Sequence, residues 1–275
     1  MPAWVIDKYG NNDVLRYSTN AMFPIINYPN EVMVKVHSAS LNPIDISMRS
    51  GYGAATLRMR RDPLNINAAG NEFPLILGRD VSGVIMECGL DVSYFKPGDE
   101  LMKAWGAHVT VTCSQNAEQL VKDLGADHMV DYKAGSVEAQ LRALKPFDLI
   151  LDNVGGDTEQ WALSCLKPWS GAKYVTLVTP FMLNTDRLGI ADGMLQSGVT
   201  IGSKALKHLC RGVHYRWALF APSGPALDEV SELVDSGKIR PVVEQVFSFS
   251  EVPQAFQKLG RGHARGKTVI NITGT

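Results

Sequence analysis

The sequence has no G-x-G-x-x-G run, although the pattern that normally surrounds one is present. From Val109 onward, short apolar runs typical of strands alternate with helical patterns. In an open parallel sheet of this kind, the central first strand ends in that glycine run, whose amides bind a pyrophosphate at a helix N-terminus. Here a turn at 96–100 leads directly into 101–106, which reads as the tail of a helix without its beginning. Gly51-x-Gly53 and Gly260-x-Gly262 lack the third glycine, and we interpret both as ordinary turns.

Cysteine is scarce, and the motifs of common hydrolases are missing. The four cysteines, at 88, 113, 165 and 210, are widely scattered without a C-x-x-C pair. This spacing argues against a disulfide framework and a zinc knuckle, and it favours a reducing compartment. The absence of G-x-S-x-G and H-E-x-x-H removes the commonest hydrolase mechanisms. We therefore expect no metal site.

Charge of one sign and long apolar runs are also lacking. The formal net charge is -1, and no apolar run approaches the roughly 20 residues that cross a bilayer. We therefore expect neither a nucleic-acid partner nor a transmembrane segment, and we interpret the basic cluster at 58–61 as a solvated loop. The first residues show neither a secretory apolar region nor an Arg-rich leader, so we expect no transit peptide in this chain.

The 275 residues are 45% hydrophobic, which suits two modest domains. Residues 1–100 read as an all-β unit, because 31–36 alternates at period two and 81–86 is a glycine-interrupted strand. In the remainder, the β-branched run at 109–113 precedes Ser114 at a helix N-cap position, and Gly125 ends that helix. Further strands are expected at 129–132, 147–152, 174–178, 199–202 and 267–272, with helices at 136–144, 227–234 and 252–259. The fold class is therefore doubly wound α/β.

Six motifs, in this order and spacing, resemble one known family. They are NPID at 42–45, FPLILGRDVSG at 73–83, FKPGD at 95–99, LGAD at 124–127, DNVGG at 152–156 and GKTVI at 266–270. Together they look like the medium-chain dehydrogenase/reductases, and most like their zinc-free quinone-oxidoreductase branch. Zinc-dependent relatives carry His-Glu where this chain has Arg79-Asp80, and their four-cysteine lobe has no counterpart here.

The resemblance implies a fold and also shows where this chain departs from it. Residues 1–100 correspond to a truncated GroES-like β-barrel domain, with 240–275 packing back toward it. Residues 101–239 correspond to a Rossmann-type domain without its first strand and glycine-rich loop. Between Glu100 and Leu101 the family carries roughly seventy further residues, including that strand and loop. An in-frame loss, by splicing or through an error in the gene model, is the simplest explanation.

The resemblance also implies an NADPH-dependent reductase of quinone-type acceptors in mitochondria, linked to quinone metabolism, with a reticulon-family protein as a further partner. An acidic residue is absent at the end of the 109–113 strand, which favours NADPH over NADH. Because the pyrophosphate loop is lacking, we expect NADPH binding to be weak or absent. The alternative is a catalytically silent truncated isoform that retains only a protein-interaction role.

Site residues follow from the same resemblance, and each has an ordinary structural alternative such as a helix cap, a packing residue or a turn. The expected NADPH contacts are Ser114, Tyr132, Asn153, Leu177, Ala218, Phe220, His263, Ala264 and Arg265. Asn42, Asp45, Ser47 and Tyr52 are expected to face the substrate. No residue stands out as an obligatory proton donor.

Overall fold

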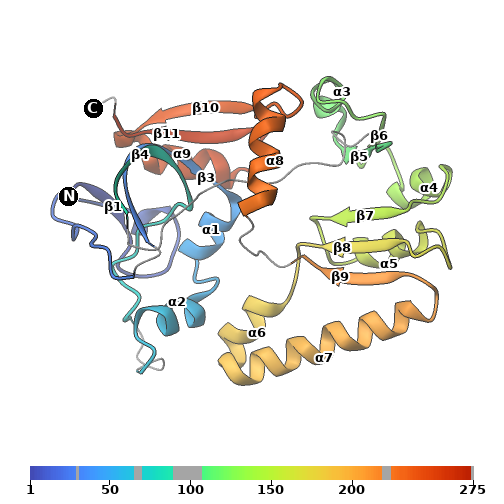
Figure 1. Cartoon of the computed structure of the whole chain (residues 1–275), viewed down its shortest axis with the longest axis horizontal. Helices are drawn as coiled ribbons and strands as arrows, with labels where there is room; N and C mark the ends of the chain where they lie inside the picture. The colour runs from blue at the N-terminus through green and yellow to red at the C-terminus, as the bar shows by residue number, and fades with distance from the viewer. Residues whose placement is uncertain (29–30, 65–69, 89–106, 219–223, 274–275) are drawn as a thin grey trace. The chain divides into compact units, whose positions relative to one another are not determined.

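The computed structural model describes residues 1–28, 31–64, 70–88, 107–218 and 224–273. The Glu100–Leu101 junction therefore lies outside the described residues. Contacts between Cα atoms divide the chain into two units, which are Met1–Phe95 with Pro241–Thr275, and Lys96–Arg240. Figure 1 shows the elements of both units.

The first unit is built on a four-stranded sheet of order β10-β11-β3-β4 (Figure 1). Its strands are β3 (Val32–Leu41), β4 (Asp80–Cys88), β10 (Val243–Ser248) and β11 (Lys267–Asn271). β3 pairs antiparallel with both β4 and β11, whereas β10 and β11 are parallel. A separate antiparallel pair joins β1 (Ala3–Val5) to β2 (Arg16–Ser18), and 3₁₀ turns occupy Asn12–Val14 and Phe249–Glu251. Residues from both ends of the chain thus share one sheet.

The expectation of an all-β unit over 1–100 is wrong, because two helices follow β3. They are α1 (Pro43–Arg49) and α2 (Ala54–Arg61), so the basic cluster at 58–61 lies on a helix and not in a loop. α1 begins where the sequence suggested only a turn: Asn42 and Asp45 form a reciprocal capping box, and Pro43 occupies the first helical position. The turn-forming and helix-starting uses of Asn-Pro look alike in sequence.

α9 (Val252–Gly260) supplies much of the core of the first unit. Its buried residues Ala255 and Phe256 pack with Leu41 of β3 and Ile270 of β11. The helix shows the expected apolar periodicity, and its sequence-based range of 252–259 agrees closely with the structure. This packing fixes the ends of β3 and β11 next to each other.

The second unit contains two parallel sheets, β5-β6 and β7-β8-β9. The strands are β5 (Thr110–Cys113), β6 (His128–Asp131), β7 (Leu149–Asp152), β8 (Lys173–Thr176) and β9 (His214–Trp217). The helices are α3 (Glu118–Asp123), α4 (Val137–Arg142), α5 (Thr158–Ser164), α6 (Phe181–Leu188), α7 (Ile190–Leu209) and α8 (Gly224–Asp235), and a 3₁₀ turn spans Gln115–Ala117. Parallel strands joined through helices confirm the predicted α/β class.

The strand expected at 199–202 is wrong, because these residues lie in the middle of α7. The β-branched run Val199-Thr200-Ile201 favours a strand locally. It nevertheless belongs to a 20-residue helix, whose partner helix α6 meets it at Gly193. The last strand of the sheet is instead β9, which the strand predictions omitted. Tertiary packing along a long helix overrides a local propensity of three residues.

Candidate functional site

The carboxyl ends of β5 and β6 enclose a polar hollow of about 300 Å³. It is lined by Ser114, Gln115, Asn116, Asp131, Lys133 and Ala134. Ser114 directly follows β5, but its hydroxyl makes no capping hydrogen bond, and α3 begins only at Glu118. Ser114 occupies the N-cap position of the 3₁₀ turn that leads into α3, as expected, but its side chain makes no capping hydrogen bond and the residue lines the hollow.

Tyr132 and Lys133 follow β6 at the same end of the sheet. The Tyr132 ring is 43% exposed, and the Lys133 ammonium lies 5.9 Å from its centroid. Sequence reasoning selected Ser114 and Tyr132 but missed Lys133, whose position two residues after a strand could have indicated it. An ammonium, a hydroxyl and an amide around one hollow can bind a phosphate, although the nearby Asp131 carboxylate opposes it. The residues present therefore fit the phosphate-bearing adenosine half of NADPH.

A second set of predicted residues follows the other parallel sheet. Asn153, Leu177 and Ala218 come directly after β7, β8 and β9, whose last residues Asp152, Thr176 and Trp217 are paired in register. The amides of Leu177 and Ala218 continue the ladders, donating to the carbonyls of Asp152 at 3.1 Å and Thr176 at 2.9 Å. The structure thus brings these three positions to one sheet edge. Phe220 lies outside the described residues.

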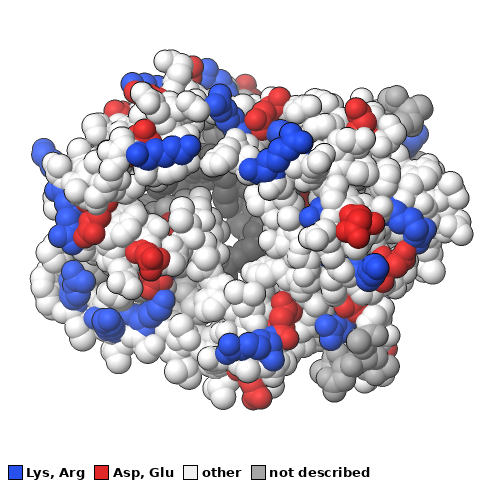
Figure 2. Space-filling model, turned by 180° about the vertical axis from the view of Figure 1, so that it is seen from behind, with Lys and Arg blue, Asp and Glu red and all other residues white. Residues whose placement is uncertain are grey.

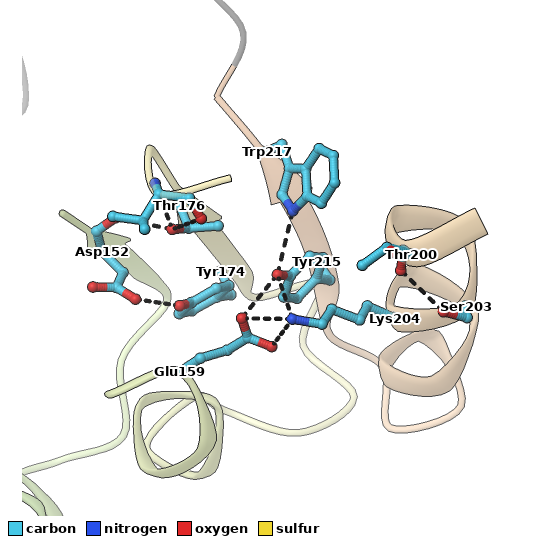
Figure 3. Close-up of polar contacts among 10 residues, drawn as sticks. Asp152, Glu159, Tyr174, Thr176, Thr200, Ser203, Lys204, Tyr215 and Trp217 are labelled. Carbon is cyan, nitrogen blue, oxygen red and sulfur yellow. Dashed lines mark hydrogen bonds and ion pairs between the residues drawn. The ribbon is translucent and has the colours of Figure 1, made fainter. Parts of the chain in front are cut away.

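A buried carboxylate holds the turn after β7 (Figure 3). Asp152 is 3% exposed, and its Oδ1 accepts from the amides of Val154 at 2.8 Å and Gly155 at 3.0 Å. Its Oδ2 accepts from the hydroxyl of the fully buried Tyr174. Burial and this carboxylate both raise the pKa of Tyr174 above its ordinary value. Because Asp152 occupies these amides, they are not donors for a pyrophosphate, so this turn does not replace the missing glycine loop.

Four side chains form a second polar network around β9 (Figure 3). Lys204 of α7 lies 2.7 and 2.9 Å from the two oxygens of Glu159 on α5. The Tyr215 hydroxyl donates to Glu159 at 3.1 Å and accepts from the Trp217 indole at 3.4 Å. Burial lowers the pKa of Lys204, but the hydrogen bonds to Glu159 and Tyr215 and the charge interactions with both together outweigh burial and raise the pKa overall. The network ties α5 and α7 to β9 and so positions Ala218.

The predicted substrate residues of the first unit lie on α1 and beside it. Asn42 is half-buried, Ser47 is exposed, and Tyr52 is half-buried behind the helix end. Asp45 is 0% exposed and accepts from the Asn42 amide at 2.8 Å, and burial raises the pKa of its carboxyl. These contacts make Asp45 a helix cap in the structure. A substrate contact for any of the four stays a prediction.

Asn42 also belongs to a half-exposed polar cluster that sequence reasoning missed. The Lys267 ammonium donates to the Asn42 amide oxygen at 2.5 Å and to Asp80 Oδ2 at 3.0 Å. The same Asp80 oxygen accepts from the Ser40 hydroxyl at 2.7 Å and from the Asn42 amide at 2.8 Å. Burial would raise the pKa of Asp80, but these donors and the charge of Lys267 hold it below its ordinary value. The cluster forms where the antiparallel ladder brings the end of β3 beside the starts of β4 and β11.

The loop before β11 carries the remaining predicted residues, His263, Ala264 and Arg265, and all three are exposed. Its shape is fixed by Glu244 of β10, which accepts from the Arg265 amide at 3.2 Å and pairs with Lys258 at 2.5 Å. The loop therefore presents basic side chains to solvent. Whether they contact phosphates stays a prediction.

Within the described part of the chain, no three His, Cys, Asp or Glu residues gather as metal ligands. Nor, over the same residues, is any helix long and apolar enough to cross a membrane. Figure 2 shows acidic and basic side chains interspersed on one face of the molecule. That face has no broad field of one sign.

Known proteins resemble this chain along most of its length. Profiles described as "Zinc-binding dehydrogenase" and "Alcohol dehydrogenase GroES-like domain" match residues 124–270 and 28–144. The zebrafish (Danio rerio) protein "NAD(P)H oxidoreductase RTN4IP1, mitochondrial" is 58% identical, covering 99% of this chain and 91% of its own. "Reticulon-4-interacting protein 1, mitochondrial" of Caenorhabditis elegans is 28% identical over 98% of this chain and 94% of its own.

The fold is likewise that of a solved structure, the quinone oxidoreductase of Coxiella burnetii. It superposes with a TM-score of 0.73 at 22% identity and covers 99% of each chain. The zebrafish alignment runs over 353 residues although this chain has 275, so that relative carries residues with no counterpart here. The matches span both units described above, and the chain belongs to the medium-chain dehydrogenase/reductase family.

Proposed function

We propose that this chain derives from an NADPH-dependent mitochondrial reductase of quinone-type acceptors and that it binds NADPH only weakly. One observation carries the proposal: five predicted cofactor positions follow the carboxyl ends of the parallel strands. These positions are Ser114, Tyr132, Asn153, Leu177 and Ala218. Open α/β sheets bind their ligands at this edge. The names of the relatives, as NAD(P)H oxidoreductases and quinone oxidoreductase, support the same activity.

The hollow at β5 and β6 supports NADPH over NADH. Ser114 stands at the end of β5, where a carboxylate would bind the ribose 2′-hydroxyl and repel a 2′-phosphate. Lys133 and Asn116 in the same lining add donors for that phosphate. Asp131 is also present, but its Oδ1 accepts from the Lys133 amide at 2.8 Å.

The acceptor would be bound by the polar cluster of the first unit. Bound nicotinamide supplies a hydride, and the protein must orient the acceptor and stabilise its carbonyl oxygen. Lys267 and Asn42 are suited to this, because one is a charged donor and the other an amide held in place by Asp80. Replacing Lys267 with Met should lower quinone turnover about tenfold through the loss of one charged donor. The control Lys35→Met removes an exposed lysine from the middle of β3.

Fluorescence titration of the purified chain with NADPH tests the proposal directly. We expect a dissociation constant well above the micromolar range, because no glycine run supplies amides for the pyrophosphate. Ser114→Asp should weaken NADPH further, since its carboxylate repels the 2′-phosphate, and should strengthen NADH, whose free 2′-hydroxyl can donate to that carboxylate. Gln119→Asp, on the exposed side of α3, controls for added charge. Equal binding of NADPH and NADH, insensitive to Ser114, would contradict the proposal.

A silent isoform with only a protein-interaction role is the second candidate. The excess length of the relatives in the alignment favours it, as does the lack of a glycine run. The nematode relative is named for an interaction with a reticulon, so a reticulon-family segment is the partner to try. A cooperative melt and reticulon binding, without NADPH binding or quinone turnover, would support this second candidate over the reductase.

A further inference from the structure

A buried hydroxyl lies at the carboxyl edge of the β7-β8-β9 sheet. Thr176 is the last residue of β8, the middle strand of this sheet, and it is 1% exposed. Sequence reasoning selected its neighbour Leu177 and missed Thr176. A hydroxyl buried to this extent is normally hydrogen-bonded, and its partners show what it holds together.

Thr176 connects the ends of all three strands. Its hydroxyl donates to the Asp152 carbonyl of β7 at 3.1 Å and accepts from the Val178 amide at 3.1 Å (Figure 3). Its own carbonyl accepts from the Ala218 amide, directly after β9, at 2.9 Å. One residue therefore holds the turn that follows its own strand and contacts the strand ends on both sides.

Asp152 extends this connection to the turn after β7. Its carbonyl accepts from both the Thr176 hydroxyl and the Leu177 amide, each at 3.1 Å, as the two lone pairs of a carbonyl oxygen allow. Its carboxylate accepts from two amides of the turn that follows. Asn153 therefore lies between a carbonyl that Thr176 holds and two amides that the carboxylate holds.

The turns after β7 and β8 also pack directly against each other. A Cβ built on Gly155 would lie 2.7 Å from Cγ1 of Val178, so the two turns approach too closely for a side chain at 155. The φ of Gly155 is 70°, a left-handed conformation that favours glycine as well. Because the Val178 amide donates to the Thr176 hydroxyl, this hydroxyl fixes the β8 side of the contact.

The positions that these turns carry come from three separate strands. Asn153, Leu177 and Ala218 follow β7, β8 and β9. Since the β5-β6 hollow fits the adenosine half of NADPH, the edge of the other sheet is left for the nicotinamide half. A site shared by three turns needs them held within about 0.5 Å of the productive geometry. Buried hydrogen bonds among the turns serve this purpose.

We infer that Thr176 is a positioning residue for the nicotinamide half of the cofactor: its hydroxyl fixes the turns after β7 and β8 relative to each other and so sets Asn153 and Leu177. The inference rests on the proposed function for the identity of the ligand. The hydrogen bonds that join the turns do not depend on a ligand, so they can be tested separately.

Two substitutions separate the hydroxyl of Thr176 from the shape of its side chain. Thr176→Val has nearly the same shape and removes only the hydroxyl, whereas Thr176→Ser keeps the hydroxyl and loses a methyl group. The matched control is Thr185→Val, because Thr185 is also 1% exposed and its hydroxyl donates within α6, to the Met182 carbonyl at 2.9 Å. Circular dichroism melts establish that the variants remain folded.

NMR titration of the full chain with reduced nicotinamide mononucleotide gives the first readout. Thr176→Val should weaken binding of this probe about fivefold through the loss of one hydrogen bond, and Thr176→Ser should bind it as the wild type does. Binding of 2′,5′-ADP, which represents the adenosine half, should stay unchanged in all variants. Equal weakening of both probes by Thr176→Val, or equal weakening of the nicotinamide probe by Thr185→Val, would overturn the inference.

Amide hydrogen exchange in the same samples gives a second readout without any ligand. Thr176→Val should speed exchange at residues 154–155 and 177–178 but not in β5 and β6, and Thr185→Val should leave all these rates unchanged. Unchanged rates in Thr176→Val would overturn the inference. A wild-type chain that binds neither probe would overturn the proposed function, and the role of Thr176 toward a cofactor with it, while the exchange rates would still decide whether Thr176 joins the turns.

Discussion

The two parallel sheets of the second unit are built alike but differ in how much they bury. The β7-β8-β9 sheet has a large core that includes Leu163, Tyr174 and Tyr215. The β5-β6 sheet has a smaller core of Val130, Leu141 and Cys165, and both cores are bordered by Phe147, Ile150 and Trp161. A larger core removes more apolar surface from water and therefore contributes more to stability. We therefore expect the β5-β6 sheet to depend on packing against its neighbour more than the β7-β8-β9 sheet does.

The facing edges of these sheets show what the missing strand would supply. In an order of 3-2-1-4-5-6, the first strand lies between the counterparts of β5 and β7. Leu149 and Leu151 on β7 are 41% and 46% exposed, although a strand inside a parallel sheet is normally covered on both faces. Apolar surface is thus exposed on β7. Exposed edges of this type favour aggregation.

Restoring the segment that is missing between the two parallel sheets should have the largest effect, a gain in NADPH affinity. The family resemblance implies that a strand and a glycine loop belong between Glu100 and Leu101, so we expect the corresponding segment of the zebrafish relative, inserted there, to restore both to the sheet. We expect NADPH affinity to rise at least about a hundredfold, since several charged hydrogen bonds to the pyrophosphate each contribute about 1.5–3 kcal/mol. Fluorescence titration measures the change.

The matched control is a segment of equal length whose glycines in that loop are replaced by alanine. It should restore the sheet but not the affinity, because alanine blocks the approach of backbone to phosphate. Unchanged NADPH affinity in the glycine-containing chimera would show that the loss at this junction is not what limits binding.

Removing the buried carboxylate of Asp152 should destabilise the β7-β8-β9 sheet and leave the β5-β6 sheet unaffected. Asp152→Ala leaves the Tyr174 hydroxyl and the amides of Val154 and Gly155 without their partner, at a cost of about 3 kcal/mol in unfolding free energy. Asp152→Asn keeps an acceptor and should lose less. The control Asp148→Ala removes a carboxylate that is 79% exposed, and it should cost under about 1 kcal/mol. Denaturant unfolding measures all three, and equal losses for Asp152→Ala and Asp148→Ala would mean that the network contributes little.

Truncating one leucine in each core measures whether the β5-β6 and β7-β8-β9 sheets unfold together. Leu163→Ala and Leu141→Ala remove equally apolar side chains that are 4% and 7% exposed, from the larger and the smaller core. We expect about 3–4 kcal/mol for Leu163 and about 2 kcal/mol for Leu141, because the smaller core can collapse around its cavity. Hydrogen exchange should show Leu141→Ala loosening β5 and β6 only, and Leu163→Ala loosening all five strands. Uniform loosening by both would mean that the two sheets unfold as one.

What the sequence could predict depends on how far apart in the chain the contacting residues lie. Strand, turn and helix followed one another at short range from 109 to 152, and Gly125 ends its helix with φ 101° as expected. The polar positions at strand ends could also be predicted, because the end of a short apolar run in the sequence indicates where a parallel strand ends. The carboxyl edge of both sheets was therefore foreseeable.

Contacts between distant segments could not be predicted in this way. Lys267 meets Asn42 only because β11 pairs with β3 across the chain, and sequence spacing says nothing of that ladder. The incorrect prediction of a strand at 199–202 has a similar cause. Helix α7 packs against α6 at Gly193, and this contact lies outside the short apolar run that suggested a strand. Asp45 shows a third limit: the Asn-Pro-Ile-Asp motif predicted a residue facing the substrate, whereas the structure shows its carboxylate in the capping box of α1.

Acidification should slightly lower the stability of the β7-β8-β9 sheet, through a buried histidine that packs against β9. His208 stacks on Tyr215 at 5.8 Å, is 8% exposed, and its Nδ1 has no hydrogen-bond partner. Burial and the charges of Lys207 and Arg211 lower its pKa below the ordinary value near 6.5, although Glu159 opposes this. The unfolded chain therefore takes up the proton first, so this contribution to stability is present above about pH 6.5 and falls as the pH drops below it.

His208→Gln should flatten that slope in melts taken between pH 7.5 and 5.5, while His214→Gln, on an exposed strand position, should leave it unchanged. If the slope survives in His208→Gln, another group carries it.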